Sequence, residues 1–141
     1  MPHILIIEAR FYIDIADMLV DGAVEALTLA GATYERIAVP GAFEIPAAIS
    51  LALKTGNYDG YVALGCVIRG ETTHYDYVCL ESARGLNDLA LQGAAIGYGI
   101  ITTENDEQAY ARADKKRKNK GADAAHACLA MVALKKQFGV A

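Results

Sequence analysis

Four short apolar runs divide the chain, at residues 3–9, 34–39, 61–68 and 94–101. Most of them are rich in Ile, Val or Leu, and each is followed within a few residues by Gly, Pro or charged residues. Short runs of this kind are typical of strands in a parallel sheet that is buried between helices. The hydrophobic pattern therefore predicts four strands.

The segments between the runs have the periodicity of helices. Apolar residues recur at three-to-four spacing from Ile13 to Leu27, with Asp and Glu on the other side, and Gly31 ends the segment. At the third helix, Thr73 and Asp76 have the spacing of a capping box. Further helices are expected after each later run, at residues 44–54, 73–91, 106–114 and 122–138.

Regular alternation of strand and helix indicates a parallel sheet with helices on both faces. We expect one α/β domain over residues 1–141, a three-layer α/β/α sandwich with a doubly wound, four-stranded parallel sheet of the flavodoxin-like type. Ligands of such sheets bind outside the carboxyl ends of the strands, near the point where the strand order reverses. This rule selects four candidate segments, at residues 10–12, 40–44, 66–74 and 98–105.

Composition and charge narrow the class of partner. The 141 residues include 13 Lys and Arg against 17 Asp and Glu, and a net charge of −4 gives no general attraction to nucleic acids or anionic membranes. No apolar stretch is long enough to span a bilayer, and the first residues lack the basic start of a secretory signal, so a cytoplasmic location is expected. Hydrophobic residues make up 54% and charged residues 21% of the chain, which hints at apolar subunit contacts.

Neither the cysteines nor the basic run at residues 115–120 indicates a specific partner. Cys66, Cys79 and Cys128 are odd in number and lie in apolar surroundings, which favours reduced packing residues over disulfides or a zinc site. The basic run contains no aromatic residue and belongs to an acidic chain. A solvated loop is therefore favoured over a nucleic-acid contact, which would show as salt-sensitive binding to DNA or RNA.

The first two candidate segments contain aromatic and acidic side chains. Phe11 and Tyr12 form either a lid over the core or a stacking platform in a pocket. In residues 40–44, small residues open a helix whose free N–H groups can meet ligand oxygens. Glu44 is either a carboxylate favoured by the positive end of that helix or an acceptor for ligand hydroxyls.

The third segment, residues 66–74, contains the most chemistry. Gly70 permits a tight turn, and Thr72 offers a hydroxyl beside the free N–H groups of a helix start, so a phosphate fits there electrostatically. His74 lies in the first turn of the helix. Because histidine exchanges protons near neutral pH, His74 is the one evident general acid or base in the four segments. The alternative is a histidine that only bonds to the backbone.

Several common chemistries lack their required residues. Gly97 and Gly99 are not followed by the third glycine and the helix of a dinucleotide fingerprint, and no Walker A sequence occurs. The spacing of His and Cys gives no metal site, and no Ser-His-Asp arrangement is suggested near the strand ends. We therefore expect no resident metal.

Four sequence blocks, taken together, resemble the 6,7-dimethyl-8-ribityllumazine synthase family, in family order and spacing and over nearly the whole chain. They are VPGAFEIPAAI (39–49), GCVIRGETTHYDYV (65–78), GIITTENDEQA (99–109) and NKGADAA (119–125). The resemblance implies a cofactor-free condensation of 5-amino-6-(D-ribitylamino)uracil with 3,4-dihydroxy-2-butanone 4-phosphate. Imine formation, phosphate elimination and ring closure would yield the lumazine and release phosphate and water.

The resemblance also assigns roles to residues. Phe11 would stack on the pyrimidine and His74 would shuttle protons. Backbone groups and one carboxylate would hold the ribityl chain, from Ala42, Phe43 and Glu44. The end of the third strand would bind the uracil edge, through Cys66, Val67 and Ile68. The following loop would meet the phosphate end, through Glu71 and Thr72.

The site implied by the resemblance is shared between adjacent subunits of a homo-oligomer. Tyr98 of the neighbour would close over the ring and Arg112 would pair with the phosphate, with Lys120 as a second cation. The family forms pentamers, some of which close into icosahedral shells, so we expect a pentamer or a larger assembly. Tyr98 stands where Phe is frequent and Tyr12 where Asn is common. The alternative function is a protein on the same fold that binds lumazine or flavin without turnover.

Overall fold

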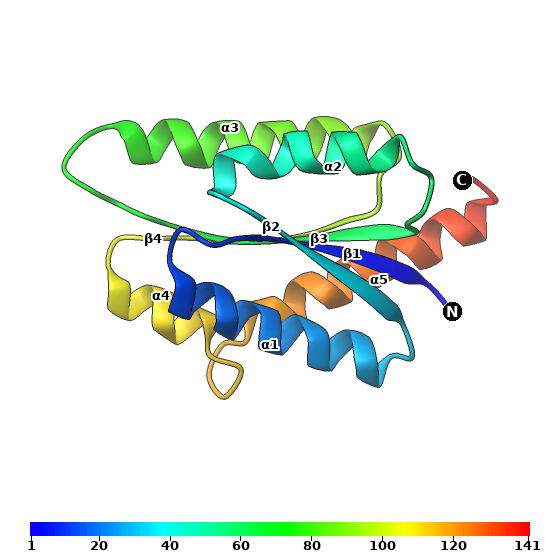
Figure 1. Ribbon diagram of the computed structural model, residues 1–141, viewed down its shortest axis with the longest axis horizontal. Coiled ribbons are helices and arrows are strands. Elements are labelled where there is room, and N and C mark those ends of the chain that lie inside the picture. Colours follow the sequence, from blue (N-terminus) through cyan, green and yellow to red (C-terminus); the bar gives the residue numbers. More distant parts are fainter.

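A parallel sheet lies between two layers of helices in the computed structural model, which describes all residues from 1 to 141 (Figure 1). The strands are β1 (His3–Ala9), β2 (Thr33–Val39), β3 (Gly60–Ile68) and β4 (Ile96–Thr103), in the order β2-β1-β3-β4. One face is covered by the 3-10 turn η1 (Ala42–Glu44), α2 (Ile45–Leu53) and α3 (His74–Leu91). The other face is covered by α1 (Ile13–Leu29), α4 (Asp106–Ala113) and α5 (Lys120–Phe138). The predicted three-layer α/β fold is confirmed.

Each face of the sheet has its own core. Toward α1 and α5 the strands contribute Ile4, Ile6, Val62 and Leu64, and toward α2 and α3 they contribute Leu5, Ile7, Tyr61 and Ala63. The faces alternate because successive side chains of a strand point to opposite sides. Central strands β1 and β3 are therefore apolar almost throughout, whereas the edge strand β2 is largely exposed and holds charged residues.

Two glycines let α5 approach its neighbours closely. A Cβ at Gly97 of β4 would overlap the carbonyl oxygen of Ala124, and a Cβ at Gly121 would overlap that of Leu19 in α1. Only glycine leaves room for backbone at such positions. The glycines of the fourth strand therefore serve helix packing. Separately, no helix of the chain has the length and hydropathy that a bilayer crossing requires.

Strand β4 begins and ends two residues later than the predicted range of 94–101. Ala94 instead belongs to the turn after α3, where its N–H donates to the carbonyl of Leu89 over 3.2 Å. At the other end, Thr102 and Thr103 continue the ladder beside Val67 and Ile68 of β3. Pairing with β3 therefore decides where the strand ends. Helix α5 likewise begins two residues before its predicted start, at Lys120.

Candidate functional site

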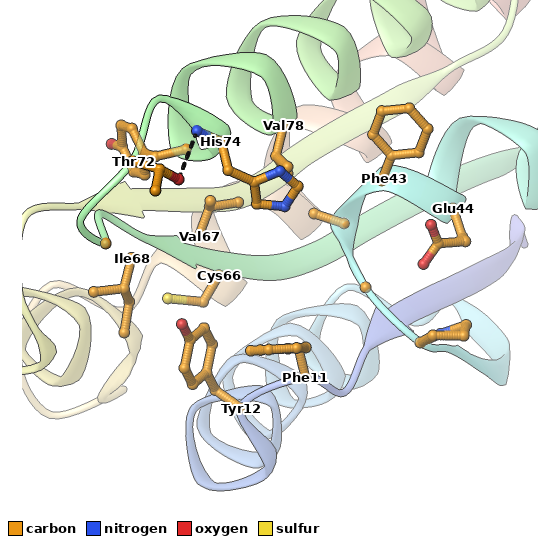
Figure 2. Close-up of a pocket in the computed structure, with 15 residues that line it drawn as sticks. Phe11, Tyr12, Phe43, Glu44, Cys66, Val67, Ile68, Thr72, His74 and Val78 are labelled. Carbon is orange, nitrogen blue, oxygen red and sulfur yellow. Dashed lines mark hydrogen bonds between the residues drawn. The ribbon is translucent and has the colours of Figure 1, made fainter.

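A cavity of about 650 Å³ opens at the carboxyl ends of β1, β2 and β3 (Figure 2). Its position outside the switch in strand order, between β1 and β3, is where a doubly wound sheet binds ligands. Nine of the twelve predicted site residues line it: Phe11, Ala42, Phe43, Glu44, Cys66, Val67, Ile68, Thr72 and His74. Three segments far apart in the sequence thus form one cavity.

The aromatic wall comes from the turn between β1 and α1. Phe11 is 72% exposed and meets the ring of Tyr12 edge to face, with 4.9 Å between the ring centroids. Tyr12 packs against the core on the α1 side of the sheet. Phe11 is therefore not a lid over the core, and Figure 2 shows its ring at the cavity wall.

The floor of the cavity is formed by the last three residues of β3, Cys66, Val67 and Ile68. Cys66 is only 8% exposed, and burial raises the pKa of its thiol to about 12, with smaller contributions from the charges of Asp106 and Cys79. At neutral pH the thiol is protonated and is no nucleophile. All three cysteines are free, with Cys66 and Cys128 buried.

His74 stands at the first residue of α3, and its imidazole points into the cavity (Figure 2). No protein group hydrogen-bonds the ring, so the imidazole is not held by the backbone. The predicted capping box is wrong. Thr73 already has helical backbone angles (φ −72°, ψ −1°) and makes no side-chain cap, and Asp76 lies 3.4 Å from Arg69 instead. The backbone N–H of His74 donates to the hydroxyl of Thr72 over 3.3 Å.

Glu44 is the only carboxylate of the cavity lining and forms no ion pair within the chain. It ends the η1 turn, in which its N–H donates to the carbonyl of Gly41 over 3.2 Å, and α2 begins at the next residue. Pro46 fits the first turn of α2, where a helix has no partner for the early N–H groups. The exposed Glu44 carboxylate is free to accept from ligand hydroxyls.

Two lining residues were not predicted from the sequence, Tyr75 and Val78 of α3. The available signal was spacing, because Val78 lies one helical turn after His74 and faces the same side. The Cζ atom of Arg69 lies 4.3 Å from the ring centroid of Tyr75. Arg69 also forms an ion pair with Glu104, with 2.6 Å between its Nε and the Glu104 Oε2. Glu71, expected at the phosphate end, is exposed and lines neither of the two cavities described.

Tyr98 and Arg112 line a second, smaller cavity of about 430 Å³ at the edge of the sheet along β4. Lys120 and Asp123 belong to it as well and form an ion pair at 3.3 Å. The Arg112 guanidinium donates to the carbonyl of Gln108 over 3.1 Å. Within one chain, Tyr98 and Arg112 therefore lie apart from the first cavity, because Tyr98 is the third residue of edge strand β4 and lies well before its carboxyl end.

The two cavities differ in charge. The first contains no Lys or Arg, and His74 is its only side chain suited to proton transfer near neutral pH. The second contains two cations beside one carboxylate. No group of three or more His, Cys, Asp or Glu side chains is placed to hold a metal ion.

Known proteins of a single family match nearly the whole chain. The model of the 6,7-dimethyl-8-ribityllumazine synthase family matches residues 2–136. A protein of that name from Sphingopyxis alaskensis is 60% identical over 140 residues, which cover 99% of each chain. Proteins of the same name from Bartonella tribocorum and Agrobacterium fabrum are 59% and 58% identical, over 98% of this chain and 93% and 97% of their own.

Proposed function

We propose a function for this chain on the basis of its family: it belongs to the 6,7-dimethyl-8-ribityllumazine synthase family. The proposed reaction is the condensation of 5-amino-6-(D-ribitylamino)uracil with 3,4-dihydroxy-2-butanone 4-phosphate. The products are 6,7-dimethyl-8-ribityllumazine, phosphate and water. The observation that carries the proposal is the first cavity, since it brings nine of the twelve expected site residues together at the sheet switch point.

The pyrimidine ring binds against the aromatic wall and the floor of the first cavity. Phe11 offers an exposed ring face for stacking. Strand β3 continues to Ile68, whereas its pairing with β1 ends at Leu64, so on the β1 side its last residues have no strand partner and their backbone can pair with the uracil edge. The ribityl hydroxyls bind the turn at Ala42 and Phe43 and the carboxylate of Glu44. This arrangement supports a ligand with one flat end and one polyhydroxylated end.

His74 moves the protons. Formation of the imine and closure of the ring each require a proton to be taken from nitrogen and given to oxygen, and a histidine is suited to both near neutral pH. Its imidazole points into the cavity without a hydrogen-bond partner in the protein. The bound substrate is therefore the partner with which the His74 imidazole exchanges protons.

The phosphate end lies at the start of α3, where Thr72 and the free N–H groups of the helix favour an anion. Arg112 of an adjacent subunit then completes the site, since its planar fork matches phosphate oxygens. The separation of Arg112 and Tyr98 from the first cavity in one chain supports a site formed by two chains.

A homo-oligomer, a pentamer or a larger assembly, also accounts for the apolar surface of α3. Only Ser82 and Leu86 of this helix are buried in the single chain, whereas Tyr77, Leu80 and Leu91 are exposed. Exposed apolar residues gathered on one helix are typical of an interface. Subunit contacts on this helix would cover part of the excess of hydrophobic over charged residues, and a monomer is expected to be inactive.

The test is incubation of the purified protein with both substrates while lumazine absorbance and fluorescence are recorded. We expect product to form well above the uncatalysed background. No acceleration would overturn the proposal. Tight lumazine or flavin binding without turnover would favour the alternative of a non-catalytic binding protein.

A further inference from the structure

Glu8 is a buried carboxylate beside the first cavity that the proposed reaction does not use. It is the last but one residue of β1 and is 3% exposed. Its Oε1 accepts from Arg10 Nη1 at 2.7 Å and from Arg36 Nη2 at 2.9 Å, and its Oε2 accepts from Arg36 Nε at 2.7 Å. Burying a carboxylate is costly unless it is paired and hydrogen-bonded, so this cluster holds its members in one geometry.

Arg10 links Glu8 to the first helix. While Nη1 of Arg10 donates to Glu8, its Nη2 donates to Asp17 of α1 at 2.7 Å. The backbone N–H of Arg10 also donates to the carbonyl of Val39 at the end of β2, over 3.1 Å. The residue immediately before Phe11 is therefore anchored to β1, β2 and α1 together.

Phe11 itself has few contacts that could position it. Its side chain is largely exposed and meets mainly the edge of the Tyr12 ring. Since its own packing does not hold the ring, its place in the cavity depends on the backbone of the turn. That backbone is held by Arg10 on one side and by the first turn of α1 on the other, where the Ala16 N–H donates to the Tyr12 carbonyl over 2.9 Å.

Arg36 connects the same carboxylate to the opposite wall. It lies in β2, three residues before the end of the strand, and its bidentate grip on Glu8 fixes β2 against β1. The chain leaves β2 directly into residues 40–44, which form the ribityl side of the cavity. Glu8 thus joins the two segments that approach the pyrimidine substrate from different strands.

We propose that Glu8 is a positioning residue for that substrate: through Arg10 and Arg36 it sets Phe11 relative to the turn at Ala42 and Phe43. This role rests on the proposed function. It acts on one substrate only, because His74 and Thr72 belong to α3 and its preceding loop, to which the cluster makes no hydrogen bond. Loss of the cluster therefore weakens pyrimidine binding and leaves the phosphate substrate and the proton transfers little changed.

The experiment compares Glu8→Gln, Arg10→Met and the control Glu25→Gln. Glu25→Gln removes an exposed ion pair of the same helix α1, that with Lys115 at 2.9 Å. Arg10→Met leaves Glu8 paired with Arg36, so this variant tests the proposal even if Glu8→Gln does not fold. The measurements are the KM of each substrate, kcat, and direct titration of the oligomeric protein with the ribitylaminouracil by calorimetry.

We expect the Kd and KM of the pyrimidine to rise about tenfold in both cluster variants, the size of effect that a small misplacement of a binding group produces. The KM of the butanone phosphate, kcat, and all parameters of Glu25→Gln should stay within about twofold. An unchanged pyrimidine Kd, or equal losses for both substrates, would overturn the positioning role. Wild-type protein that binds the pyrimidine without making lumazine would overturn the proposed function alone.

Discussion

Each of the two cavities described above lacks a chemical group that the other contains. The first, about 650 Å³, is the larger and is mostly apolar, and it contains His74 but no Lys or Arg. The second, about 430 Å³, is smaller and more open, and it contains Arg112 and Lys120 but no histidine. One cavity can bind a ring and transfer protons, and the other can grip an anion.

The physical origin of this difference is the position of each cavity on the sheet. Adjacent parallel strands β2, β1 and β3 end side by side, so their turns enclose a crevice with backbone groups and apolar side chains around it. Edge strand β4 has a neighbour on one side only, and its open side is lined by long cationic side chains from α4 and α5. A condensation that expels phosphate needs both environments, which two adjoining subunits can supply together.

The largest expected effect is that of His74→Ala in the first cavity. Removing a general acid and base lowers kcat by at least about 100-fold, whereas lumazine binding, measured by its fluorescence, changes little. His126→Ala is the matched control, since His126 is exposed on α5 and lines neither cavity. A variant with near-normal kcat would show that protons move by another route.

Arg112→Met, in the second cavity, should have the next largest effect, and this effect should be confined to binding of the phosphate substrate. Loss of a guanidinium that pairs with phosphate raises the KM of the butanone phosphate by roughly tenfold to 100-fold, with the pyrimidine Kd little changed. Arg117→Met, at an exposed arginine without an ion pair, serves as the control. Steady-state kinetics with each substrate varied in turn provide the measurement.

Mixing the two variants distinguishes a shared site from one inside a single chain. When His74→Ala and Arg112→Met protomers are dissociated and reassembled together, some sites receive intact His74 from one chain and intact Arg112 from its neighbour. Activity should then exceed that of either variant alone. If the mixture is no more active than the average of its parts, both cavities serve the same chain and the site is not shared.

A smaller effect is expected on stability, at the buried cluster of Glu8, Arg10 and Arg36. Burial acts to raise the pKa of Glu8, but hydrogen bonds and charges from Arg36 and Arg10 outweigh it and hold that pKa below its ordinary value. A carboxyl with a lowered pKa contributes stability above its ordinary pKa, and that contribution disappears as pH falls through the folded-state pKa. Glu8→Gln should therefore be destabilised at neutral pH, with a gap to wild type in urea unfolding that narrows as the pH falls below the ordinary pKa of a carboxyl group.

The smallest effect is expected for Cys66→Ala. Burial holds the pKa of this thiol at about 12, so no thiolate is present at neutral pH, and the side chain belongs to the core on the α1 side of the sheet. Activity should stay within about twofold of wild type and the pH profile of kcat should keep its shape. A large loss would assign the sulfur a role that the geometry does not provide.

Local patterns in the sequence were sufficient for the elements and their order. Alternating apolar runs and helical periodicity predict strand β1 with its observed bounds, and the glycines and prolines mark most of the turns. The strand ends then indicate where ligands bind, and the four blocks indicate the family. Such features are local because strand and helix periodicities are written into consecutive residues.

Contacts between distant residues were decided only by the tertiary structure. Glu8 and Arg36 are 28 residues apart and meet because β1 and β2 pair in parallel, and no local pattern shows that register. Likewise, pairing with β3 sets the end of β4, and the place of β4 at the sheet edge separates Tyr98 and Arg112 from the first cavity. The sequence by itself determined which elements form and which residues lie at their ends, whereas packing determined which of those residues share a cavity.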